Sequence, residues 1–105
     1  MEVAQEEIFG PVISVITYED EADAIEIAND SIYGLSGAVY TADLEHGYEV
    51  ARQIRTGTIS VNASIMDFTL PFGGYKQSGI GREGGVEGLD EFFEIKTVHL
   101  PAWSG

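Results

Sequence analysis

Residues 37–62 read GAVYTADLEHGYEVARQIRTGTISVN, in which two short apolar segments flank an amphipathic one. The segments at 37–40 and 58–62 are rich in β-branched and small apolar residues, which is typical of buried strands. Between them, Asp43 is a candidate N-cap for a helix, and Gly57 is well placed to end it. Two strands joined through a helix predict a parallel pair with a right-handed crossover.

A similar unit precedes this one. The run VISVIT at 12–17 predicts a further strand, and Asp20 offers an N-cap for a helix that ends near Asn29. The resulting β-α-β-α-β order predicts an α/β fold with a partial parallel sheet. Two helices cannot cover both faces of such a sheet, so we expect an exposed apolar surface that requires a partner.

The pattern changes after the third strand. Residues 63–88 contain seven glycines, which predicts a turn-rich loop, and a short helix is expected over 86–93. Residues 95–100 alternate between apolar and polar side chains and end at Pro101. This pattern predicts a terminal edge strand, and 95–101 is therefore a candidate assembly strand.

The composition narrows the class of protein. The chain has 105 residues, which suits a single domain at 1–105, and 44% of them are apolar, enough for a core. The formal net charge is −13, and residues 1–50 hold twelve acidic residues but no Lys or Arg. The negative electrostatic potential of such a charge repels nucleic acid and anionic membrane surfaces. Without cysteine or an apolar run long enough to span a membrane, a soluble cytoplasmic protein is expected.

Four groups of residues are candidates for chemistry. The run GIGREG at 79–84 fits a phosphate-binding pattern, but no strand leads directly into it, so a structural turn is predicted. His46 and His99 lack ligand spacing around them, and no metal site is expected. Before the first strand, the Glu6 and Glu7 carboxylates lie beside Phe9 in the sequence. A carboxylate there could accept hydrogen bonds from vicinal hydroxyls while the ring packs on a flat heterocycle, or the acidic residues could simply be solvated. The loop at 65–70 is either buried core or the wall of a ligand crevice.

Taken in order, these segments resemble the C-terminal part of the aldehyde dehydrogenase superfamily. The resemblance covers essentially the whole chain and rests on these segments: QEEIFGPV at 5–12, IAN at 27–29, YGL at 33–35, GTISVN at 57–62, PFGGYKQSG at 71–79, GRE at 81–83 and EIKTV at 94–98.

The resemblance implies a reaction and a set of roles. Enzymes of this family oxidise aldehydes to carboxylic acids with NAD or NADP, through a cysteine thiolate and a glutamate-activated water. By resemblance, Glu7 holds the nicotinamide ribose and Phe9 packs near the nicotinamide. Phe68 and Phe72 belong to the substrate pocket, Asn62 supports the active-site loop, and the strand at 95–100 serves subunit assembly.

The same resemblance implies that much of the enzyme lies outside this sequence. The nucleophilic cysteine, the general-base segment and the Rossmann domain would precede Met1, so no catalytic residue is assigned here. We expect a fragment that is inactive alone, binds NAD or NADP weakly or not at all, and forms a homo-oligomer or complements a larger dehydrogenase. The alternative is a stand-alone binding or assembly module without enzymatic activity.

Overall fold

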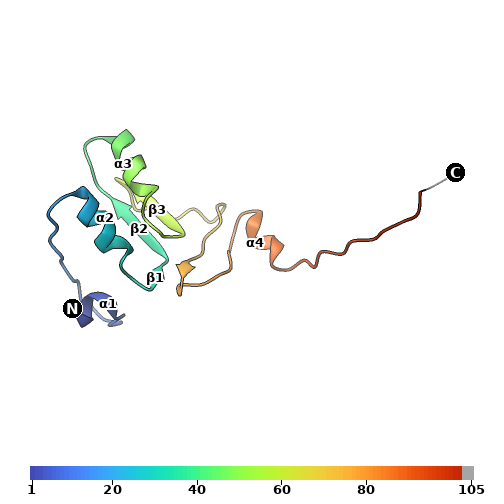
Figure 1. Cartoon of the computed structure of the whole chain (residues 1–105), viewed down its shortest axis with the longest axis horizontal. Coiled ribbons are helices and arrows are strands. Elements are labelled where there is room, and N and C mark those ends of the chain that lie inside the picture. Colours follow the sequence, from blue (N-terminus) through green and yellow to red (C-terminus); the bar gives the residue numbers. More distant parts are fainter. Residues whose placement is uncertain (103–105) are drawn as a thin grey trace.

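The computed structural model describes residues 1–102, so the last three residues of the expected 1–105 domain lie outside the described part. Within residues 1–102, four short helices and four short strands follow in the order helix, helix, strand, strand, helix, strand, strand, helix (Figure 1). The helices are α1 (Glu2–Gln5), α2 (Glu21–Asn29), α3 (Leu44–Ala51) and α4 (Glu87–Asp90); the strands are β1 (Tyr33–Gly34), β2 (Ser36–Val39), β3 (Thr58–Val61) and β4 (Tyr75–Lys76). The fold is therefore mixed α/β, as the sequence predicted.

The centre of the fold is the β2-α3-β3 unit. Strands β2 and β3 pair in parallel, with Ser36 opposite Thr58 and Val39 opposite Val61. Helix α3 forms the connection between them, as the pattern of residues 37–62 predicted (Figure 1). It packs closely, because a Cβ on Gly47 would lie 2.8 Å from a Val61 methyl group.

A second, two-stranded sheet joins the first half of the chain to the glycine-rich segment. Strand β1 pairs antiparallel with β4, with Tyr33 opposite Lys76 and Gly34 opposite Tyr75. The amide of Gly34 also donates to the Ser78 hydroxyl at 2.9 Å. This pairing was not predicted, since it joins residues more than forty positions apart.

Both predicted N-caps are confirmed. The Asp20 carboxylate accepts from the amide of Asp23 at 2.9 Å, and the Asp43 carboxylate accepts from the amide of His46 at 3.1 Å. Helix α3 ends at Ala51, earlier than the position of Gly57 suggested, and α4 is shorter than the predicted helix over 86–93.

Two predicted strands are absent from the described residues. The segment at 12–17 is extended but has no strand partner, so the predicted β-α-β-α-β order is not confirmed. The segment at 95–100 likewise runs outward without pairing, as the long red tail of Figure 1 shows. A strand needs a neighbour to satisfy its backbone hydrogen bonds, and no described part of the chain supplies one at either place.

The chain leaves most of its apolar residues uncovered. Its accessible surface is 9058 Å², whereas a folded monomer of 11.4 kDa would expose about 5,800 Å². The radius of gyration is 19.5 Å, against about 13 Å for a compact domain of this length. Among the described apolar residues, Ala51 alone is buried. The predicted exposed apolar surface is thus present, and it is larger than one uncovered sheet face.

Candidate functional site

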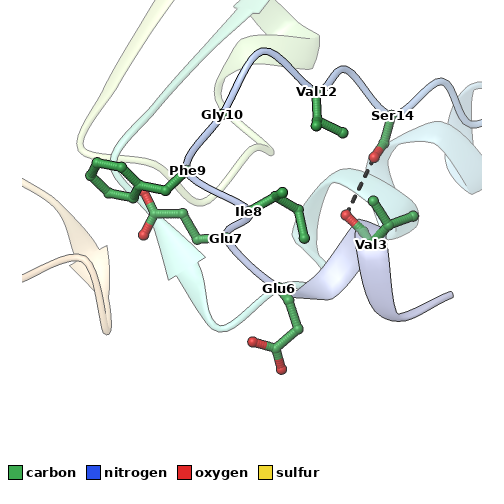
Figure 2. A pocket seen from close by; sticks show the side chains of 8 residues that line it. All are labelled: Val3, Glu6, Glu7, Ile8, Phe9, Gly10, Val12 and Ser14. Carbon is green, nitrogen blue, oxygen red and sulfur yellow. Dashed lines mark hydrogen bonds between the residues drawn. The ribbon is translucent and has the colours of Figure 1, made fainter.

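The segment after α1 carries the first predicted site. Residues 6–10 belong to no helix or strand, with bends at Glu6 and Gly10, and Figure 2 shows the side chains of Glu7 and Phe9 pointing to the same side, with Glu6 directed elsewhere. They line a shallow pocket of about 410 Å³, whose walls are Val3, Glu6, Glu7, Ile8, Phe9, Gly10, Val12 and Ser14. The ring of Phe9 is 91% exposed. A large aromatic side chain is thus presented outward instead of being packed.

The backbone at Phe9 is strained. Its φ angle is 57°, in the left-handed region that bulky residues rarely adopt. Such strain persists where a chain is held in a particular conformation, and it is often found at functional sites. Here it turns the Phe9 ring to the side on which the Glu7 carboxylate lies (Figure 2).

Glu7 also faces a second, larger hollow. This pocket has a volume of about 640 Å³, and its wall includes Glu7 on one side and Tyr33, Gln77 and Ser78 on the other. Among the described residues, no hydrogen bond or ion pair to the Glu7 carboxylate is found. Both of its oxygens can therefore accept from a ligand, and a pair of vicinal hydroxyls suits them.

The side chain of Asn62, just after β3, makes two hydrogen bonds to the backbone of one residue, Thr41. Its Oδ1 accepts from the amide of Thr41 and its Nδ2 donates to the carbonyl of Thr41, both at 2.7 Å. Its φ angle is 54°, a left-handed conformation that Asn tolerates better than most residues. The side chain thus fixes the loop between β2 and α3.

Phe68 and Phe72 lie in a different part of the molecule. Phe72 exchanges two backbone hydrogen bonds with Glu83, both of 2.7 Å. Phe68 is 82% exposed, and its carbonyl lies against Gly84, where a Cβ would approach to 2.9 Å. Neither ring lines the two pockets that contain Glu7. The chain therefore does not bring the predicted cofactor and substrate residues together.

The glycine-rich run at 79–84 is irregular backbone between turns at 77–78 and 85–86, and Glu83 within it forms an isolated bridge with Phe72. It follows β4 but does not lead into a helix at Gly84, and α4 begins only at Glu87. Gly79 and Gly84 both have positive φ angles, of 139° and 76°. Glycine is needed at both positions for its backbone conformation, and at Gly84 also because a Cβ would lie 2.9 Å from the carbonyl oxygens of Phe68 and Leu70.

Sequence reasoning missed Lys76, which ties β4 to the end of α2. Its Nζ donates to the carbonyls of Asn29 at 2.8 Å and Ser31 at 2.9 Å. A cation at a helix C-terminus is favoured by the helix dipole. Asn29 in turn donates to the carbonyl of Gln53 and accepts from the amide of Arg55, both at 2.8 Å. These contacts join residues that are distant in the sequence, and no local sequence pattern predicts them.

Two exposed groups have shifted pKa values. The hydrogen bond to the Glu21 carboxylate raises the pKa of His46 above 6.5 and links α2 with α3. The hydrogen bonds from Thr69 lower the pKa of Asp67. Within residues 1–102, no group of three or more metal-ligating side chains is present, and no helix has the length and apolar character needed to cross a membrane.

The described residues form a small α/β unit in which the Glu7 carboxylate and the Phe9 ring project from the segment that follows α1. The sequence pattern of the aldehyde dehydrogenase family matches residues 1–98. The chain therefore belongs to the aldehyde dehydrogenase family, as its resemblance implied.

Two curated relatives illustrate the similarity. The chain is 58% identical over 98 residues to a 3-succinoylsemialdehyde-pyridine dehydrogenase from Pseudomonas sp., covering 93% of this chain and 20% of that protein. It is 56% identical over 98 residues to a putative aldehyde dehydrogenase from Staphylococcus saprophyticus, covering 93% and 21%. The chain thus spans about a fifth of the length of these relatives.

Solved structures agree in backbone as well as sequence. An aldehyde dehydrogenase from Mycobacterium tuberculosis complexed with NAD+ matches with a TM-score of 0.92 and 54% identity, over 100% of this chain and 22% of that one. A betaine aldehyde dehydrogenase from Staphylococcus aureus in complex with NAD+ matches with a TM-score of 0.84 and 50% identity, over 88% and 18%.

Proposed function

We propose that this chain supplies the C-terminal part of the catalytic domain of an NAD(P)-dependent aldehyde dehydrogenase, which oxidises an aldehyde to a carboxylic acid. The observation that carries the proposal is the match to an NAD+-bound enzyme over 100% of the chain at a TM-score of 0.92. That match includes the segments at 12–17 and 95–100, which pair with no strand among the described residues. Their conformation is the one expected of parts that pack against a larger body.

The residues present fit the nicotinamide end of such a cofactor. Glu7 accepts hydrogen bonds from the two ribose hydroxyls, since neither of its carboxylate oxygens has a partner among the described residues. Phe9, with its ring exposed on the same side, packs near the flat nicotinamide (Figure 2). When bound, the nicotinamide supplies hydride acceptance. These two side chains hold and orient it.

The second group of residues shapes the other side of the reaction. Phe68 and Phe72, on the loop that packs against residues 83–85, form part of the aldehyde pocket. Asn62 holds the β2–α3 loop through Thr41 and so supports the active-site loop. In the assembled enzyme, the missing segments bring the two groups together.

The uncovered surface supports assembly with a larger body. About 3,300 Å² of surface is exposed beyond that of a compact monomer of this mass. The segments at 12–17 and 95–101 become strands when the remaining parts of the dehydrogenase, and a second subunit, pair with them. The partner is accordingly the rest of the enzyme and, through 95–101, another copy.

Alone, the chain is expected to be inactive. It has no cysteine, so it cannot supply the thiolate that attacks the aldehyde. Two contacts at the nicotinamide end also give little affinity after the rigid-body cost of association, so NAD+ binding no tighter than about millimolar is expected.

A chimera tests the proposal. In it, the Mycobacterium tuberculosis enzyme carries this chain in place of its own matching segment. Aldehyde-dependent NAD+ reduction is expected from the chimera and not from the isolated chain. Glu7→Gln in the chimera should raise the KM for NAD+ about tenfold or more, because it weakens charge-assisted hydrogen bonds to the ribose.

Glu26→Gln is the matched control: this exposed carboxylate on α2 lines neither pocket that contains Glu7, so its change should leave that KM within about twofold. An inactive chimera, together with an isolated chain that forms a stable oligomer, would favour the alternative of a stand-alone assembly module. Equal effects of the two substitutions would remove Glu7 from the cofactor site.

A further inference from the structure

The N-terminal segment that carries Glu7 is joined to the rest of the chain by one hydrogen bond. Within the described residues, Gln5 Nε2 donates to the Asp30 carbonyl at 2.9 Å, and no other hydrogen bond links residues 1–18 to residues 19–102. The remaining bonds of this segment are internal, such as that from the Ser14 hydroxyl to the Val3 carbonyl. The exposed side-chain amide of Gln5 therefore holds residues 1–18 against the C-terminal end of α2.

The other end of that bond is firmly held. Three successive carbonyls at the end of α2 accept side-chain hydrogen bonds: Asn29 and Ser31 from Lys76, and Asp30 from Gln5. The Lys76 bonds are partly buried, and Lys76 itself belongs to β4, which pairs with β1. The turn that receives Gln5 is thus anchored to the sheet from a second direction.

This anchor lies beside the pocket that Glu7 faces. Gln5, Glu6 and Glu7 line one side of the 640 Å³ pocket, and Ser31, next to Asp30, lines the other. Gln5 is only two residues before Glu7, at the last position of α1. Any movement of Gln5 away from Asp30 therefore changes the position of the Glu7 carboxylate relative to the rest of the site.

We propose that Gln5 is a positioning residue for cofactor binding, because its side chain docks the Glu7 segment onto the C-terminal turn of α2. This inference rests on the proposed function, in which Glu7 holds the nicotinamide ribose. Gln5 itself does not touch the cofactor. It keeps Glu7 at the place where both hydroxyls can be reached.

The chimera described above provides the test. Gln5→Ala should raise the KM for NAD+ about three- to tenfold, the effect of losing one neutral hydrogen bond, and leave the KM for the aldehyde unchanged. Gln5→Lys should restore much of the loss, because an ammonium group can also donate to a carbonyl at a helix C-terminus.

Gln53→Ala is the matched control. Its side-chain amide also donates to a helix carbonyl, that of Glu49 at 3.1 Å, but this bond lies within the α3 region and far in sequence from Glu7. It should leave the KM for NAD+ unchanged, whereas any general loss of stability should be similar in the two alanine variants.

The outcomes separate the two proposals. If Glu7→Gln raises the KM for NAD+ while Gln5→Ala does not, the positioning role is refuted and the proposed function stands. If Gln5→Ala raises the KM for NAD+ and for the aldehyde equally, or Gln5→Lys gives no rescue, the role is again refuted. If the unsubstituted chimera neither binds NAD+ nor turns over, both proposals fail.

Discussion

Gly57 is the position at which a single added methyl group should do the most damage. It lies just before β3, and a Cβ built on it would be 1.6 Å from the carbonyl oxygen of Gly73. Cβ atoms essentially never approach another heavy atom closer than 3.0 Å, so the two backbone segments must separate by about 1.4 Å. No side chain can rotate to relieve this contact, because the obstacle is backbone.

The separation also strains the start of the sheet. The amide of Gly57 donates to the carbonyl of Gly34, and the amide of Thr58 to that of Leu35, each at 3.1 Å. Overpacking in cores costs about 1–3 kcal/mol where side chains can adjust. We therefore expect Gly57→Ala to destabilise this region by about 3 kcal/mol, which is roughly a hundredfold in the local opening equilibrium.

Hydrogen exchange by mass spectrometry of the chimera measures this directly, since it reports opening segment by segment. Peptides covering β2 and β3 should exchange about a hundredfold faster in Gly57→Ala. Gly37→Ala, within β2, is the control, because its Cβ would meet side-chain atoms only at 3.8 Å or more. Unchanged exchange in the Gly57 variant would show that Gly57 and Gly73 are not in close contact.

Two further predictions concern side chains that join separate elements. Asn62→Gly keeps the left-handed backbone accessible but removes both hydrogen bonds to Thr41. The Thr41 amide hydrogen should therefore exchange about fivefold to a hundredfold faster. An unchanged exchange rate would show that these two hydrogen bonds do not hold the β2–α3 loop. The pKa of His46 should lie above 6.5 by NMR titration and fall in Glu21→Gln. Because the folded-state pKa is raised, the His46–Glu21 contact should stabilise the fold fully below pH 6.5 and lose its effect as the pH rises through the raised value. A His46 titration indifferent to the Glu21 substitution would contradict this.

The parts of the fold that could be predicted from the sequence are those fixed locally. Asp20 and Asp43 are N-caps because each carboxylate accepts from an amide three residues on, a contact that the sequence displays directly. The β2-α3-β3 unit could be predicted for the same reason. The spacing of its apolar residues changes from a strand pattern to a helix pattern and back within 26 residues, and its crossover has one favoured hand.

The errors came from contacts that the sequence does not display. The segment at 12–17 has the composition of a strand, but composition does not provide a pairing partner, and no strand within residues 1–102 pairs with it. The same holds for 95–100. In the candidate site, the nearness of Glu7 to Phe9 follows from their spacing. The bonds of Asn62 to Thr41, 21 residues away, and of Gln5 to Asp30, 25 residues away, depend on the folded chain.

The distribution of charge bears on which part of the cofactor Glu7 contacts in the proposed function. Residues 1–50, which include Glu7, contain twelve carboxylates and no Lys or Arg. A nicotinamide dinucleotide carries its negative charge on the pyrophosphate, and an acidic surface repels that group but can accept hydrogen bonds from ribose hydroxyls. The glycine-rich run at 79–84 leads into no helix at Gly84, so no helix N-terminus lies there to offset the repulsion. Under the proposed function, another part of the enzyme therefore holds the phosphates of the cofactor, and Glu7 and Phe9 contact only its nicotinamide end.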